Sequence, residues 1–120
     1  ANEEFKFKRM FLDYLEARGI YTNKEQLAKY GEPYFDKKNN RIEFKLDGFE
    51  REMAKQRINM DRVDLVMKCI NVLKAKKNRG KWQGKSCVSW SIQGNKNESD
   101  KIIWEGEALS IDHSEEIEDE

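Results

Sequence analysis

The order of predicted elements from residue 41 onward constrains the fold of this chain more than any other feature. Residues 41–46 alternate apolar and charged side chains, which is the pattern of a half-buried strand. Two helical patterns follow over 48–57 and 60–76, separated by a tight break at 58–59. The pattern therefore predicts a strand that runs directly into a pair of helices.

The rest of the chain completes this order. Residues 86–92 alternate around Trp90 and predict a strand, and residues 101–105, which carry Trp104, predict a second strand after the polar loop 93–97. In front of residue 41, the patterns predict a helix over 4–18 and a short helix over 23–30. The elements together predict one α+β domain.

Length and composition set the organisation of the chain. The 120 residues, of which 38% are apolar and 38% charged, are enough for one domain with a modest core. We expect this domain to span 1–111, followed by a flexible acidic tail over 112–120. No apolar run is long enough to span a membrane, and the chain begins without the apolar segment of a signal peptide.

The element order resembles that of the winged-helix superfamily, in which a helix, a strand, two helices and a hairpin follow one another. The resemblance implies three main helices and a small antiparallel sheet, with 23–30 as an extra helix. It also implies that 60–76 is the recognition helix and that 93–97 is the wing.

The same resemblance implies a set of nucleic-acid contacts. Carried over, they are Arg62, Lys68, Asn71 and Lys74 on the recognition helix and Lys96 in the wing. The chain departs from the family pattern in the carboxylates Asp61 and Asp64, which stand where a DNA reader places its contacts, and in a net charge that is not basic. Since many winged helices dock proteins instead, these departures favour a protein partner as an alternative.

The charge distribution supports a nucleic-acid surface independently. Residues 51–85 hold eleven Lys or Arg against three acids, whereas 98–120 hold ten acids and one lysine. The predicted basic turn 78–85 carries Lys81, Trp82 and Lys85, a combination suited to phosphates and stacked bases. Trp82 is equally compatible with a packing role.

The sequence offers little for catalysis. The single histidine, His113, lies in the tail, which leaves Cys69 and Cys87 without a partner for nucleophilic or zinc chemistry. Residues 80–86 resemble a phosphate-binding loop, but only three residues separate the glycines and the order of strand and helix is inverted. We therefore expect no enzymatic activity, no cofactor and no metal.

The function predicted from the sequence is a non-enzymatic winged-helix module that binds DNA or RNA within a larger protein or assembly. The first alternative is a winged helix that binds a protein partner. The second is a small single-strand-binding protein with a regulatory acidic tail. We expect no membrane association and, because two cysteines make no disulfide framework, an intracellular location.

The periodicities also predict the core. We expect Trp90 and Trp104 to be buried where the strands close over the helices. The predicted core comprises Ile42, Phe44, Met53, Val63, Val66, Ile70, Leu73, Val88 and Trp90.

The acidic tail generates a first testable prediction. Deleting residues 112–120 removes six carboxylates that oppose the charge of 51–85. We expect stability to change little and nucleic-acid affinity to rise, most clearly at low salt where screening is weak. A salt titration of binding by the full and truncated chains measures this effect, and equal affinities at low salt would contradict it.

Overall fold

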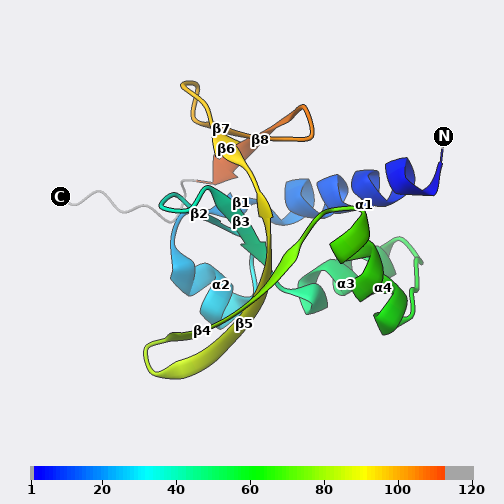
Figure 1. The fold of residues 1–120 in the computed structure, drawn as a ribbon, viewed down its shortest axis with the longest axis horizontal. Coiled ribbons are helices and arrows are strands. Elements are labelled where there is room, and N and C mark those ends of the chain that lie inside the picture. The colour runs from blue at the N-terminus through cyan, green and yellow to red at the C-terminus, as the bar shows by residue number, and fades with distance from the viewer. Residues whose placement is uncertain (1, 113–120) are drawn as a thin grey trace.

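The computed structural model describes residues 2–112, which form four helices and one mixed sheet of eight strands (Figure 1). The helices are α1 (Glu3–Arg18), α2 (Lys24–Tyr30), α3 (Leu46–Lys55) and α4 (Arg62–Asn71). The strands are β1 (Ile20–Tyr21), β2 (Tyr34–Asp36), β3 (Arg41–Phe44), β4 (Lys76–Trp82), β5 (Lys85–Gln93), β6 (Asn95–Lys96), β7 (Lys101–Trp104) and β8 (Glu107–Asp112).

The sheet has the order β4-β5-β3-β2-β1-β8-β7-β6. β1 runs parallel to β2 and β8, and the remaining neighbours are antiparallel. β5 and β6 follow each other in the chain but lie near opposite ends of this order, with only Gly94 between them. A Cβ atom on Gly94 would come within 2.7 Å of Ile102 Cγ2, so the crossing requires glycine.

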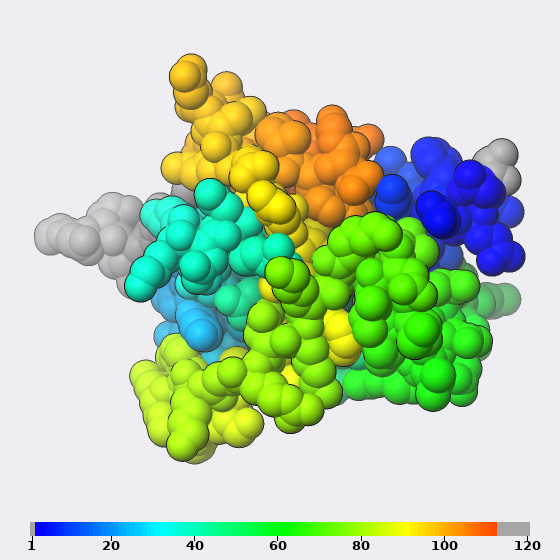
Figure 2. Space-filling model, viewed as in Figure 1, coloured from blue at the N-terminus to red at the C-terminus, as the bar shows by residue number. Residues whose placement is uncertain are grey.

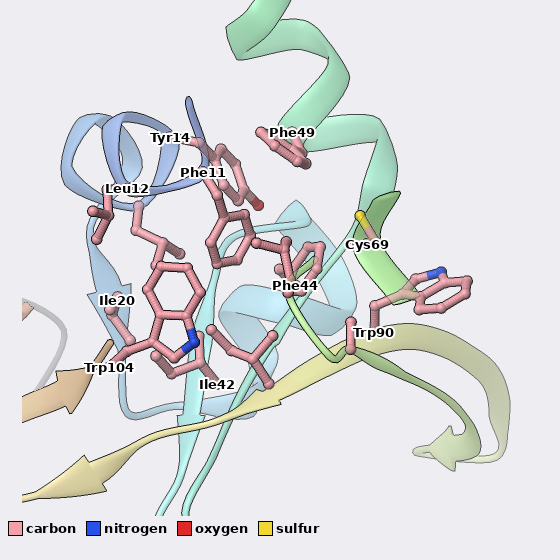
Figure 3. Packing of buried hydrophobic residues seen from close by; sticks show 14 of the residues in the cluster. Phe11, Leu12, Tyr14, Ile20, Ile42, Phe44, Phe49, Cys69, Trp90 and Trp104 are labelled. Carbon is pink, nitrogen blue, oxygen red and sulfur yellow. The ribbon is translucent and has the colours of Figure 1, made fainter. Parts of the chain in front are cut away.

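α1 supplies the aromatic centre of the core. The helix begins after Asn2, whose side chain accepts a hydrogen bond from the Phe5 amide, and ends at Gly19 with φ of 83°. Its buried face carries Phe7, Phe11, Leu12, Tyr14 and Leu15. Figure 3 shows how side chains from α1, α3 and the strands meet in this cluster.

The prediction of a winged helix with three main helices and a small antiparallel sheet is wrong. The strand at 85–93 pairs with β3 and β4 instead of with 101–104, which lies between β6 and β8. Residues 93–97, predicted to be the wing, hold the end of β5 and the whole of β6. The physical reason is that 76–82, expected as helix end and basic turn, forms a strand that occupies one side of β5.

Other predictions are confirmed. Helices occupy 3–18 and 24–30, and the strand at 41–44 joins the sheet beside β5. Trp90 and Trp104 are buried, at 7% and 5% exposure. Among the predicted core residues, Ile42, Phe44, Met53 and Leu73 are also buried, and Val66 and Val88 are half-buried.

Val63 and Ile70 were predicted to be buried, but they are 67% and 41% exposed. α4 carries two apolar stripes at helical spacing. The helix instead buries the stripe that begins with Leu65 and Cys69, and the stripe of Val63, Met67 and Ile70 faces outward. We call Val63, Met67 and Ile70 the α4 stripe.

The orientation of α4 generates the second prediction. Leu65 is fully buried, so Leu65→Ala should cost roughly 2–5 kcal/mol of unfolding free energy. Ile70→Ala, a matched truncation on the opposite face, should cost less than about 1 kcal/mol because the side chain is already 41% exposed. Urea unfolding measures both changes, and a larger loss for Ile70→Ala would contradict the orientation.

Candidate nucleic-acid interface

The β4–β5 hairpin is the longest strand pair of the sheet, and its turn lies at the edge of the molecule (Figures 1 and 2). Seven residue pairs join its strands, from Lys76↔Ser91 to Trp82↔Lys85. The turn consists of Gln83 and Gly84, whose φ angles are 53° and 81°. Two central residues with positive φ fit the twist of a two-residue hairpin, so the turn continues the ribbon without splaying its strands.

The hairpin lies in a long stretch without carboxylates. Between Asp64 and Glu98 the sequence contains eight Lys or Arg and no acid. Five of these cations lie on the hairpin, and all five side chains are exposed. They are Lys76, Lys77, Arg79, Lys81 and Lys85.

The hairpin gathers five cations without a carboxylate partner into ten consecutive residues, 76–85, although other cations of the described chain, such as Lys68 and Lys74, are also unpaired. Among residues 2–112, none of the five hairpin cations lies within 4.0 Å of a carboxylate oxygen. Elsewhere, Arg18 pairs with Glu32 and Glu52, and Lys8 pairs with Glu105. The hairpin therefore presents uncompensated positive charge.

The register divides the hairpin side chains between two faces. Lys77, Arg79 and Lys81 lie opposite Trp90, Val88 and Ser86, on the face that continues into the core. We call Lys77, Arg79 and Lys81 the cation row. Lys76, Asn78, Gly80 and Trp82 lie on the other face, opposite Ser91, Ser89, Cys87 and Lys85.

The second face borders a polar cleft of about 390 Å³. Several polar groups that line this cleft already hydrogen-bond to one another. Arg41 donates to the Ser91 hydroxyl and carbonyl at 3.1 and 2.8 Å, and Ser89 donates to Glu43 at 2.9 Å. Burial lowers the pKa of Arg41, while the Glu43 carboxylate acts in the opposite direction. The cleft is lined by Lys24, Asp36, Asn39, Arg41, Glu43, Lys76, Asn78, Arg79, Gly80, Cys87, Ser89 and Ser91.

A separate groove of about 470 Å³ lies on the face of the cation row. Figure 2 shows atoms of β5, in yellow, at the bottom of a hollow between β4 and the helices α3 and α4. The apolar part of the groove comes from α3, α4 and β5, and the polar part from the ends of the same elements and from β4. We call this the β5 groove, lined by Lys45, Leu46, Asp47, Arg62, Val66, Lys77, Val88 and Trp90.

Trp82 lies on the face opposite the β5 groove and is half-buried. The Lys29 Nζ atom of α2 is 5.9 Å from its ring centroid, within the range of a cation–π contact. Lys29 is also paired with Glu25 at 2.9 Å. This contact links the tip of the hairpin to α2.

The predicted contacts do not form one surface. Lys81, Trp82 and Lys85 lie together at the hairpin tip, whereas Lys96 lies on β6 at the other end of the sheet order and pairs with Asp100 at 3.1 Å.

On α4, Arg62 is paired with Asp47 at 3.2 Å and with Glu50, so its charge is compensated. Lys68 is half-buried and Asn71 is exposed. Lys74 follows the helix and donates to the Asn71 carbonyl at 2.8 Å.

Three exposed hairpin cations were not among the predicted contacts, namely Lys76, Lys77 and Arg79. Lys76 ended the predicted recognition helix, Lys77 lay between that helix and the predicted turn, and Arg79 lay in the turn. The absence of any acid from 65 to 97 was a signal that could have identified all three.

The described residues offer no metal centre. No group of three or more His, Cys, Asp or Glu side chains in residues 2–112 could hold an ion. Cys69 and Cys87 are free and buried, and burial raises the pKa of the Cys69 thiol to about 12. In the same part of the chain, no helix has the length and apolar character needed to cross a membrane.

The arrangement is suited to binding an extended polyanion. Comparison of the chain with known protein families, with curated proteins and with solved structures found no match.

Proposed function

We propose that this chain is a non-enzymatic nucleic-acid-binding module whose contact surface is the β4–β5 hairpin. The observation that supports it best is the uncompensated charge of the hairpin, where five exposed cations have no carboxylate partner among residues 2–112. Phosphate contacts made by such cations release counterions, which is the main source of sequence-independent affinity for nucleic acid.

The shape of the hairpin supports the same function. A two-stranded ribbon is one of the two elements that fit the major groove of duplex DNA, and an extended edge can also follow a single strand. The cations occur along the whole of β4 and at the first residue of β5. A polyanion lying along the ribbon could therefore contact several of them at once.

An intracellular location is part of this proposal. Its support is the pair of free cysteines, which are buried as thiols in the structure.

Protein binding is a second candidate because the α4 stripe is exposed. Val63, Met67 and Ile70 expose 67%, 49% and 41% of their surface on one helix face. Exposed apolar side chains that cluster in this way are typical of protein contacts. Met67→Glu with Ile70→Glu should leave nucleic-acid affinity unchanged if the hairpin is the nucleic-acid surface, and should weaken self-association if the α4 stripe joins two copies of the chain.

Reversal of the hairpin charge gives the third prediction. In the variant K76E/K77E/R79E/K81E/K85E, binding of an oligonucleotide at low salt should be lost. If all five cations contact phosphates, the log–log salt slope of the wild type should be about −3.5 for a single strand and about −4.5 for a duplex. Fluorescence anisotropy across a salt series measures both quantities.

The matched control changes cations outside the hairpin. K68E/K74E reverses the half-buried Lys68 and the exposed Lys74, and should retain most of the affinity. A wild type that does not bind at low salt would refute the function. A K68E/K74E variant as defective as the hairpin variant would place the contact surface on α4.

A further inference from the structure

We propose that the ligand is a single strand held on one face of the hairpin, with its phosphates along the cation row and an unpaired base in the β5 groove. This inference rests on the proposed nucleic-acid function and adds the ligand class and the contact face. It follows from the register of the hairpin, the charge on its two faces and the position of the groove.

The spacing of the cation row matches a phosphate backbone. Lys77, Arg79 and Lys81 are alternate residues of one strand and share one face by register, although Arg79 also borders the polar cleft. Alternate residues of a strand are about 6.6–6.8 Å apart, which is close to the separation of adjacent phosphates along an extended strand of nucleic acid. Three successive phosphates can therefore meet three successive cations without bending either chain.

The two faces of the hairpin differ in their carboxylates. The polar cleft contains Asp36 and Glu43 among the cations Lys24, Arg41, Lys76 and Arg79, and Glu43 acts to raise the pKa of Arg41. In the β5 groove, the single carboxylate is Asp47, and Arg62 lies 3.2 Å from it. A polyanion on the cation row therefore meets one ion-paired carboxylate, whereas the polar cleft would present it with two.

The β5 groove continues from the cation row. Lys77 borders the groove and lies opposite Trp90, and Arg79 lies opposite Val88. Val66 of α4 lines the groove together with Val88 and Trp90 of β5, so a flat group that enters meets apolar side chains from two elements. The groove volume of about 470 Å³ lies within the range of small-molecule sites.

The polar rim gives the groove groups that can hydrogen-bond to a base edge. Lys45 donates to the Val88 carbonyl at 2.6 Å and stands beside the apolar walls, while Asp47 and Arg62 form the other side. In a duplex the bases are stacked and paired, so only an unpaired base can enter such a groove. The groove therefore favours single strands over duplexes.

The experiment compares two double variants with equal charge change. K77E/K81E alters the cation row, and K76E/K85E alters the other face of the same hairpin. The probes are a labelled oligothymidine of about 16 nucleotides and a duplex of the same length. For the single strand, K77E/K81E should reduce the salt slope by about 1.4, the value for two lost phosphate contacts, and K76E/K85E should change it by less than half of that.

The groove is tested by filling it. Val66→Phe adds a ring to a half-buried wall, and thermal unfolding reports whether the variant is folded. Its affinity for oligothymidine should fall about ten-fold, within the range for loss of one base contact, while any duplex affinity stays unchanged. Photo-crosslinking of oligothymidine that carries 4-thiothymidine to the wild type is independent of the variants and should label Val66, Val88 or Trp90 instead of Trp82.

The outcomes separate the two proposals. If the wild type binds neither probe, the proposed function fails. If it binds but K77E/K81E and K76E/K85E are equally defective, the function stands and the assignment of one face fails. Preference for the duplex, or crosslinks to Trp82 alone, would overturn the single-strand inference.

Discussion

The ring of Phe11 contacts aromatic rings from several separate elements, and the arrangement of the molecule depends on these contacts. Its centroid lies 4.8 Å from that of Phe44 on β3, 5.2 Å from Phe49 on α3 and 5.4 Å from Trp104 on β7. In the sequence, α3 precedes the β4–β5 hairpin and β7 follows it. One residue of α1 therefore packs against both the sheet and α3 (Figure 3).

The same core holds the base of the hairpin. β5 contributes Trp90 and Ile92 to the cluster, and its partner β3 contributes Ile42 and Phe44. The far half of the hairpin leaves this core, and there the side chains become exposed and basic. A rigid base and a projecting polar end are what a binding ribbon needs, because phosphate contacts then require little ordering of the backbone.

The sequence was sufficient to predict those helices and strands whose own residues form a clear apolar face. Helix 4–18 and strand 41–46 have one clear apolar face each, and the structure has a helix over 3–18 and a strand over 41–44, although Leu46 belongs to α3. β4 has no such face, since Lys76, Lys77 and Arg79 are polar on both sides of the strand. Its structure comes from pairing with β5, which is tertiary information that a local pattern does not contain.

The candidate site was predicted in part, for related reasons. Lys81 and Lys85 were identified from their position in a basic segment that also lies at the hairpin tip. Arg62 was identified by analogy with a recognition helix. Its positive charge is paired with the Asp47 carboxylate, and this ion pair depends on how α3 lies against α4. The face occupied by each hairpin cation depends on strand register, which could not be known before β4 was recognised as a strand.

β4 is also the outermost strand of its sheet, and this position has a consequence for association between copies of the chain. Its outer edge is not paired with any other strand among residues 2–112, so its backbone N–H and C=O groups are available to a strand from another molecule. Five like charges on the hairpin oppose such pairing by repulsion. Neutralising them, whether by substitution with glutamine or by a bound polyanion, removes that protection, whereas reversing their sign preserves it. The cations that attract a ligand would thus also keep the unliganded protein from adding strands edge to edge.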